Sequence, residues 1–184
     1  MSDSGSSPRR EIIQAEALAW LREHPAPPHS SVVTSLPDRS ELPDHDFTRW
    51  KAFFLEAARA VLRWVPEDGL AMFFQSDIRY DGAWVDKGYL VMRVAEELGA
   101  QLVFHKIACR KPAGTITHGR ASYSHLLAFS RTVRGMPRHP GPDVLGDAGH
   151  QPWSRAMGVK ACEAACRYLK DETDTRLVVD PFCG

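Results

Sequence analysis

The sequence predicts an α/β fold with a mostly parallel sheet and helices on both of its faces. Short apolar segments typical of strands alternate with amphipathic segments typical of helices, an order that favours parallel strands joined by crossover helices. Leu70–Gln75 is a nearly continuous apolar run, as expected for a strand covered on both faces. Leu102–Ala108 and Ser124–Ser130 are joined by a loop without a helical pattern, which predicts one antiparallel hairpin at a sheet edge.

The first third of the chain contains two predicted helices and one strand. Residues 1–6 are small and polar, a composition typical of a disordered tail. Ser7-Pro8 is a favourable helix start, and the spacing of the apolar residues predicts a helix from there to about Glu23. Ser31–Thr34 is the first predicted strand. Thr48–Val65 has a strongly apolar face at helical spacing and predicts a long helix.

The remaining elements follow in the same alternation. Tyr89–Leu98 predicts an amphipathic helix that Gly99 closes in the position just after its end. The span 131–152 is rich in Gly, Pro, Arg and His and has no periodicity, which predicts a long loop of a kind that often carries function. Val159–Leu169 predicts another amphipathic helix. Leu177–Val179, a short β-branched run, predicts a buried last strand.

Length and composition indicate one ordinary globular domain, which we place at residues 7–184. The chain has 184 residues, 43% of them hydrophobic and 25% charged. The formal net charge is +0, so contact with nucleic acid would need a local basic patch. Because no secretory signal or membrane-length apolar run is present, we expect a cytoplasmic protein whose four cysteines are free thiols.

Two predicted strands end directly in chemically unusual stretches. The first strand runs into Thr34-Ser35-Leu36-Pro37-Asp38, and the last runs into Asp180-Pro181-Phe182-Cys183-Gly184. In open α/β sheets, ligands bind just beyond the carboxyl ends of the strands. A carboxylate and a glycine turn at such a place can receive a polar ligand.

Taken together, these stretches resemble the circularly permuted class of S-adenosylmethionine-dependent methyltransferases that modify exocyclic amino groups of bases in nucleic acids. In that family a catalytic tetrapeptide, Ser/Asp-Pro-Pro-Tyr, comes first and the cofactor motif, Asp-Pro-Phe-x-Gly-x-Gly, comes late. The order between them also matches: Gly99, the strand through His105 and Ala108, the Lys111-Pro112 turn, and then the strand Tyr123–Ser130. The resemblance covers most of the chain from residue 30 onward.

The resemblance implies a Rossmann-like methyltransferase fold with S-adenosylmethionine as its cofactor and no metal. It assigns the catalytic position to Ser35, Leu36, Pro37 and Asp38. It assigns cofactor binding to Thr34, Trp153, Ser154, Asp180, Pro181, Phe182, Cys183 and Gly184.

The catalytic stretch departs from the family pattern at two positions. Leu36 replaces a proline, and Asp38 replaces the aromatic residue that stacks on a flipped base. Since a carboxylate cannot stack, the departure favours RNA or a single-stranded target, with RNA preferred over DNA as the substrate. Three aromatic residues near strand ends remain as stacking candidates. They are Phe47, Tyr80 and Trp84.

The cofactor stretch departs from the pattern on its C-terminal side. The family's next helix and strands would lie beyond Gly184, so we expect a sheet that lacks them and has Leu177–Val179 at an edge. The neighbours inward from that edge should be Ser31–Thr34, Leu70–Gln75, Ser124–Ser130 and finally Leu102–Ala108. We therefore expect a fragment, a misread gene end, or a chain completed by a partner chain.

Other polar residues have both a functional and a structural interpretation. Asp77 either faces the pocket or caps the next turn, and Ser154 either lies over the cofactor or is a helix N-cap. Asp180 and Asp38 could likewise be ordinary turn residues. A basic run in the long loop either binds a phosphate backbone or only solvates the loop. It consists of Arg131, Arg134, Arg138 and His139.

The cysteines and one strand histidine are expected to be structural. Cys162 and Cys166 lie one helical turn apart, but no second pair at metal-binding spacing accompanies them, so we expect them in the core. Cys183 is expected to be a small filler in its motif, because no partner base is indicated. His105 is expected to be a core histidine with satisfied hydrogen bonds.

Three functions therefore remain open from the sequence. The first is a methyltransferase acting on an amino group of nucleic acid. The second is a catalytically inactive domain of the same fold that binds RNA or a partner protein, favoured by the missing aromatic residue. The third is a small-molecule hydrolase using Ser35 or Cys183, for which no nucleophile elbow or base is visible.

Overall fold

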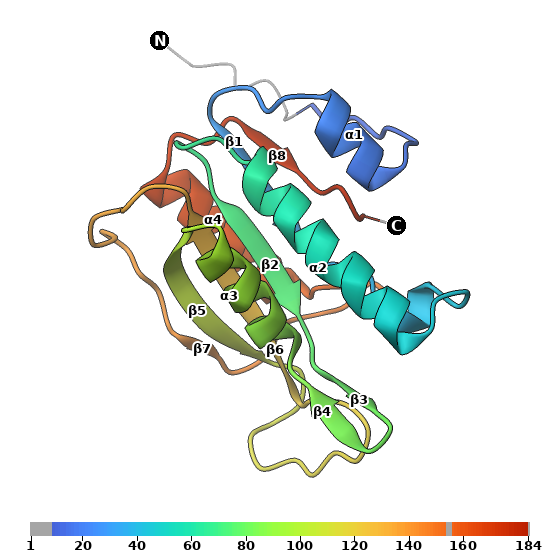
Figure 1. Ribbon diagram of the computed structural model, residues 1–184. Coiled ribbons are helices and arrows are strands. Elements are labelled where there is room, and N and C mark those ends of the chain that lie inside the picture. Colours follow the sequence, from blue (N-terminus) through green and yellow to red (C-terminus); the bar gives the residue numbers. More distant parts are fainter. Residues whose placement is uncertain (1–8, 154–155, 184) are drawn as a thin grey trace.

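A six-stranded sheet forms the centre of the computed structural model, which describes residues 9–153 and 156–183 (Figure 1). The strand order is β7-β5-β6-β2-β1-β8. The bounds in that order are Val144–Leu145, Gln101–Cys109, Tyr123–Ser130, Ala71–Gln75, Ser30–Thr34 and Leu177–Val179. β6 is antiparallel to both β2 and β5, whereas the other neighbouring pairs are parallel. The predicted order of the five strands from β8 to β5 and the antiparallel pairing of β5 with β6 are confirmed, but β7 lies outside β5, so this hairpin is not at the edge of the sheet.

Helices cover both faces of this sheet. α2 (Phe47–Trp64) and α3 (Lys87–Glu97) lie in front of it in Figure 1, with the short α1 (Ala17–Glu23) beside α2, and α4 (Val159–Glu172) lies behind. Asp46 and Asp86 begin α2 and α3 as N-caps, each accepting a backbone N–H from three residues further on. Gly99 has a φ of 70°, as predicted for the residue that closes α3.

The alternation of side chains along β2 explains its continuous apolar sequence. Phe73 points toward α2 and packs with the fully buried Trp50 and Phe54. Met72 points to the opposite face and belongs to the core beneath α4. Because both faces of β2 are covered, none of its positions needs a polar side chain.

The first helix is shorter than the sequence predicts. A helix was expected from Ser7-Pro8, which lie outside the described residues, but α1 begins only at Ala17. Ile13 is 55% exposed, so the apolar positions before α1 have little core to pack against. Since packing supplies most of a short helix's stability, this segment stays irregular until Glu16 caps two backbone N–H groups.

A second hairpin, which was not predicted from the sequence, extends beyond the carboxyl end of the main sheet (Figure 1). It consists of β3 (Ile78–Tyr80) and β4 (Ala83–Val85), paired antiparallel. The turn residues Asp81 and Gly82 have φ values of 48° and 78°, as a type I′ hairpin turn requires at both central positions. A short 3₁₀ helix at Arg39–Glu41 and the strand β7 were also not predicted.

The last strand is an edge, but it is not buried. Leu177 and Val178 are 42% and 49% exposed, because β8 has only β1 as a neighbour in the described sheet. Val179 is half-buried. The expectation of a buried strand is therefore wrong at two of its three positions. None of the described helices combines the length and apolar character that a membrane crossing requires.

Candidate functional site

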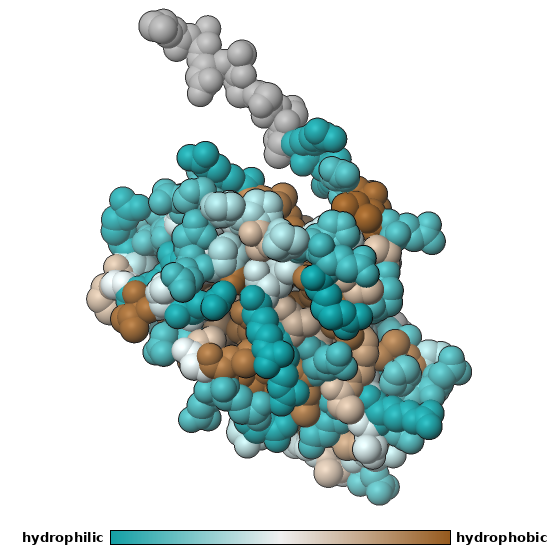
Figure 2. All heavy atoms as spheres, turned by 45° about the horizontal axis from the view of Figure 1, so that its top comes forward, coloured by the Kyte–Doolittle hydropathy of each residue, from teal (hydrophilic) through white to brown (hydrophobic). Residues whose placement is uncertain are grey.

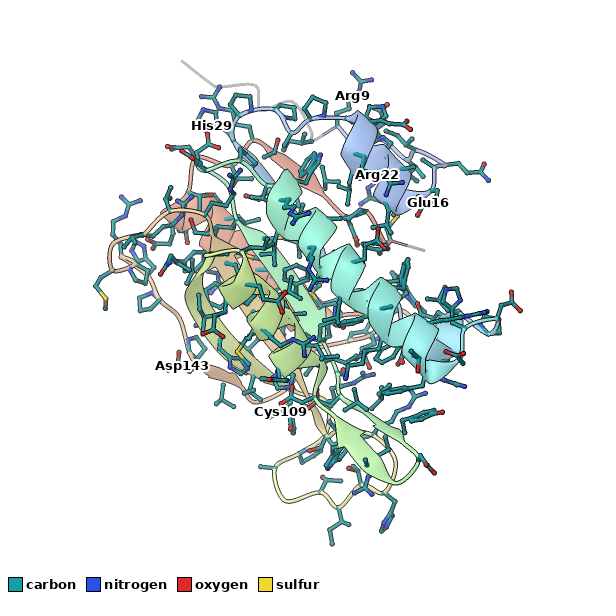
Figure 3. The ribbon with its side chains drawn as sticks, viewed as in Figure 1. Arg9, Glu16, Arg22, His29, Cys109 and Asp143 are labelled. Carbon is teal, nitrogen blue, oxygen red and sulfur yellow. The ribbon has the colours of Figure 1, made fainter. Side chains whose placement is uncertain are left out.

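The turns that follow β1, β2 and β8 lie together at the carboxyl end of the sheet. The three strands are mutually parallel neighbours, so their last residues point to the same edge. The loop from β5 to β6 reaches this end as well, and Figure 3 shows Cys109, the last residue of β5, far from His29, which directly precedes β1. The topology therefore brings Ser35–Asp38 and Asp180–Cys183 to one end.

Asp180 is joined directly to the end of the neighbouring strand. Thr34 Oγ1 donates a hydrogen bond of 2.6 Å to Asp180 Oδ1, and the backbone N–H of Phe182 donates to the same oxygen at 3.1 Å. Although Asp180 is exposed as a residue, the protein around its carboxyl group removes enough water to raise its pKa, and the two hydrogen bonds offset this only in part. Both bonds use Oδ1, so Oδ2 can accept from an amino or hydroxyl group of a ligand.

The loop Ser35–Asp38 is anchored from below and open above. The side chain of Leu36 is buried in the front core with 2% exposure, and Trp50 Nε1 donates to the Pro37 carbonyl at 3.2 Å. Ser35, in contrast, is exposed. Because the Leu36 side chain points into the core, this residue can contribute to a site only through its backbone.

Asp38 faces a buried lysine that was not singled out from the sequence. Lys87, in the first turn of α3, has a side chain that is 4% exposed, and its Nζ lies 3.9 Å from Asp38 Oδ2. Burial lowers the pKa of Lys87, while the charges of Asp38 and Glu41 act in the opposite direction. The carboxylate at the position of the family's aromatic residue is thus accompanied by a buried ammonium group.

A buried carboxylate and two histidines form a hydrogen-bonded chain beside this pair. Asp77 Oδ1 accepts the backbone N–H of Lys87 at 2.9 Å, and Asp77 Oδ2 lies 3.1 Å from His125 Nε2. His125 Nδ1 in turn lies 2.9 Å from His105 Nε2. Gly88 lies against the His125 ring, because a Cβ there would approach the ring to 3.0 Å. Asp77 therefore both holds the start of α3 and orients His125.

This chain changes the ionisation of its members. Burial acts to raise the pKa of Asp77, but the hydrogen bond and charge of His125 and the backbone N–H groups of α3 outweigh it, and the net pKa is lowered. For His105, burial and the neighbouring His125 lower the pKa. The expected core position of His105 is wrong, since it is exposed and only its ring nitrogen reaches inward.

The same cluster is the place where the described residues could hold a metal ion. Ligand atoms of Asp77, Asp86 and His125 lie within 4.8 Å of one another. However, Asp86 Oδ1 already caps α3 at 2.7 Å, and Asp77 and His125 already bond each other. Hydrogen bonds therefore satisfy this cluster.

The remaining residues predicted to bind the cofactor do not take part in the contact between Thr34 and Asp180. Phe182 packs edge-on against Phe53 of α2, with ring centroids 6.4 Å apart, whereas Cys183 is exposed. Trp153 is 63% exposed. Ser154 and Gly184 lie outside the described residues, and the N-cap position of α4 belongs to Gly158.

Cys162 and Cys166 do not lie in the core, which corrects the prediction. Both are exposed free thiols. The inward positions of α4 are filled instead by Ala161 and Ala165, which are fully buried. Each cysteine follows one of these alanines directly, and a shift of one residue turns a helical side chain by about 100° toward solvent.

The basic run of the long loop lies at the opposite end of the sheet. Arg134 donates to the Asp68 carbonyl at 2.7 Å, just before β2, and Arg138 donates to the Asp171 carbonyl at 2.7 Å, at the end of α4. An open hollow of about 870 Å³ lies beside these residues, remote from Asp180. In Figure 2, which turns this end forward, hydrophilic residues cover most of the visible face. These contacts favour the interpretation that the arginines fix the loop.

Two of the three aromatic stacking candidates are engaged with each other. The rings of Phe47 and Tyr80 stack at 4.1 Å with an interplanar angle of 11°. Trp84, on β4, is 51% exposed and has the Arg79 guanidinium 4.8 Å from its ring centroid. Of these three, Trp84 therefore offers the most accessible ring.

Comparison with known proteins supports the fold. No protein-family model and no curated protein sequence matches the chain. Among solved structures, TTHA0409 of Thermus thermophilus, a candidate DNA modification methylase, matches with a TM-score of 0.64 and 17% identity over 92% of this chain and 78% of that one. The same protein was also solved in complex with S-adenosyl-L-methionine, matching at 0.62 and 16% over the same shares.

A second protein has a similar fold. The PvuII DNA methyltransferase, specific for cytosine N4, matches with a TM-score of 0.55 and 15% identity over 89% of this chain and 64% of that one. At these identities the likeness establishes the fold: the chain has the mixed α/β architecture of these DNA methyltransferases.

Proposed function

We propose that this protein is an S-adenosylmethionine-dependent methyltransferase that modifies an amino group of nucleic acid. The observation that supports it best is the hydrogen bond from Thr34 to Asp180, which joins the ends of two neighbouring parallel strands. A cofactor held at Asp180 would lie directly beside the loop Ser35–Asp38. Methyl transfer requires this proximity, because alignment of donor and acceptor is the main contribution a protein makes to it.

In the proposed site, the residues around the end of β8 bind the cofactor. Asp180 Oδ2 would accept from the cofactor's amino group, and Thr34 would keep the carboxylate in place through Oδ1. The other residues assigned to cofactor binding are Pro181, Phe182, Cys183, Gly184, Trp153 and Ser154. The cofactor supplies an activated methyl group.

The loop after β1 would position the substrate. The Ser35 hydroxyl and the backbone carbonyls of Ser35 and Leu36 would accept hydrogen bonds from the substrate amino group, since the Pro37 carbonyl already accepts from Trp50. In this position the substrate's amino nitrogen would face the methyl group that the cofactor would supply. The nitrogen would then lose one proton, and Asp38, the carboxylate of this loop, would accept it.

The finer parts of the proposal concern the target and the assembly. We propose RNA in preference to DNA, because a carboxylate at position 38 replaces a stacking ring. Circular permutation of the motifs and a single methyltransferase-like domain at residues 7–184 are part of the proposal. The exposed edge of β8 offers a place for a partner chain to complete the sheet, and four free thiols fit a reducing cytoplasm.

A catalytically inactive domain of the same fold, binding RNA or a partner protein, is the second candidate. One observation favours it: Asp38 already accepts the backbone N–H of Arg39 at 2.7 Å and faces Lys87, so its carboxylate is occupied without a substrate. The two candidates make different predictions for methyl transfer.

Calorimetry with S-adenosylmethionine and its demethylated product tests the proposal. We expect binding that is lost in Asp180→Ala and retained in the matched control Asp174→Ala, an exposed acid three residues before β8. Transfer of a labelled methyl group from the cofactor to mixed RNA, single-stranded DNA and duplex DNA then tests activity. Absence of heat at millimolar cofactor would refute the proposal for this chain. Binding without transfer to any of the three would favour the inactive domain.

A further inference from the structure

Two loops project side by side from the carboxyl end of the sheet, next to the proposed site (Figure 1). One is the β3–β4 hairpin, residues 78–85, and the other is the loop 110–122 between β5 and β6. A β-bridge between Ile78 and Arg120 joins them. We call their combined surface the tip platform.

The tip platform is basic although the chain as a whole is neutral: Arg79 and Asp81 of the hairpin balance each other in formal charge, and the excess of positive charge comes from the loop 110–122. The loop 110–122 contains Arg110, Lys111, His118 and Arg120 and no acidic residue, and residues 111–120 are all exposed. Within the described part of the chain, no ion pair involves Arg79, Arg110, Lys111 or Arg120.

Arg110 and Arg120 belong to the same loop, and their like charges interact. Burial and the neighbouring charge of Arg120 lower the pKa of Arg110, and Arg110 Nη1 is oriented by a hydrogen bond of 3.1 Å to Ser76 Oγ. Two guanidinium groups on one loop, neither of which has an acidic partner among the described residues, attract an anion, and a phosphate group matches guanidinium donors in both charge and geometry.

The same surface presents an aromatic ring. Trp84 is half-exposed, and the Arg79 guanidinium lies against its ring. On the opposite face of the hairpin, Tyr80 is held by its stack on Phe47 and by the Arg39 guanidinium 5.5 Å from its centroid. An accessible ring beside phosphate-binding arginines is the combination that proteins use for unpaired bases, because stacking needs a base whose face is free.

We propose that the tip platform binds a single-stranded segment of nucleic acid, with Trp84 stacking on a base and Arg110 and Arg120 contacting the backbone phosphates. This inference rests on the proposed function and narrows its substrate to unpaired nucleic acid. It also gives the stacking role to Trp84, since Asp38 cannot fill it. The platform lies at the same end of the sheet as Ser35, so a strand bound there can reach the catalytic loop.

Fluorescence anisotropy with labelled single strands of RNA and DNA about 12 nucleotides long, and the matched duplexes, tests this inference. We expect the single strands to bind more tightly than the duplexes. Trp84→Ala should weaken single-strand binding about tenfold and Trp84→Phe should retain most of it. Arg120→Ala should weaken binding to all sequences and reduce the slope of log K against log salt by about 0.7.

Controls away from the platform make the result specific. Arg63→Ala, at the exposed end of α2, and Lys170→Ala, near the end of α4, remove comparable exposed cations and should leave the affinity unchanged. An equal loss in these controls, wild-type affinity in Trp84→Ala, or tighter binding of the duplex would each overturn the inference. Cofactor calorimetry on the same variants separates the two proposals, because loss of strand binding at the tip platform should leave cofactor affinity intact.

Discussion

Substituting Lys87 and substituting its partner Asp38 should have different effects on the stability of the protein. Lys87→Met removes a charge that is almost fully buried and keeps a side chain of similar length. Asp38→Asn keeps the hydrogen bond to Arg39 but removes the carboxylate that offsets the buried ammonium charge most, so that only Glu41 and Asp77 still offset it. We therefore expect Asp38→Asn to destabilise the protein, and Lys87→Met to leave the free energy of unfolding unchanged or higher.

The structure limits the size of both effects. Removing one partner of a fully buried ion pair costs about 3–5 kcal/mol, whereas replacing a buried charge with an apolar residue is often neutral or stabilising. The 3.9 Å between Lys87 Nζ and Asp38 Oδ2 is longer than a hydrogen bond, and the Asp38 side chain is 29% exposed to solvent. We therefore expect a loss of about 1–3 kcal/mol for Asp38→Asn, and a change between zero and a gain of about 2 kcal/mol for Lys87→Met.

The pH dependence provides an independent check on Lys87. Burial lowers its pKa from 10.5 in the folded state, so the unfolded chain binds this proton more tightly. As the pH rises toward the unfolded value, the cost of the buried charge is relieved and the wild type gains stability. The advantage of Lys87→Met should therefore shrink as the pH rises toward 10.5.

Urea unfolding of the wild type, both single variants and the double variant measures these differences. The double variant should lose most of the destabilisation of Asp38→Asn, because no unpaired ammonium remains. The reasoning would be refuted by a Lys87→Met variant that is less stable than Asp38→Asn, or by single effects that simply add in the double variant.

Three further predictions concern the neighbouring residues. Asp180→Asn should weaken cofactor binding about 10–100-fold. It should also raise the melting temperature at pH 7, because it removes a carboxylate whose raised pKa makes its ionised form costly in the folded state. Thermal scans should show that this gain fades as the pH falls toward 4, where the wild-type carboxyl group becomes protonated. Asp77→Asn should make the free energy of unfolding less dependent on pH below about pH 4, since the lowered pKa of Asp77 stabilises the wild type only above that range. Circular dichroism at decreasing pH measures the midpoint of acid unfolding, and an unchanged midpoint would contradict the role given to His125. Trp50→Phe should cost about 1–3 kcal/mol in denaturant titrations, because it leaves the Pro37 carbonyl without its donor and a small cavity in the core; a loss below a few tenths of a kcal/mol would show that this bond does not anchor the loop.

The fold could largely be predicted because its signals are local and repeated. The apolar run of β2 and the periodic faces of α2 and α3 reflect what each segment packs against, and the structure confirms them. The exceptions arose where packing was absent. Ile13 continues a helical pattern without a core beneath it, and Val178 belongs to a strand with one neighbour. A pattern of apolar residues cannot reveal whether another element covers them.

The β3–β4 hairpin, in contrast, had a signal that could have been used. Asp81-Gly82 between alternating residues is a strong indication of a two-residue hairpin turn, and both residues have the positive φ that it requires. The polar residues Asp77 and Arg79 concealed it, because they suggested only the end of the preceding strand. This turn signal would have placed Trp84 on a hairpin that follows β2, at the carboxyl end of the sheet where the proposed site lies.

The electrostatic chain of the site could not be predicted, because its contacts join distant parts of the sequence. Asp38 meets Lys87, and Asp77 meets His125, only after the sheet has formed. These contacts bear on the choice between an enzyme and an inactive domain. A lone aspartate in place of an aromatic residue indicates a lost site, but a buried lysine opposite it is costly and destabilising without that aspartate. Because the same lysine bonds Asp77 through its backbone, the pair is built into the start of α3. The contact thus gives Asp38 a structural role, in agreement with the inactive domain, so methyl transfer to a substrate is the measurement that separates the two candidates.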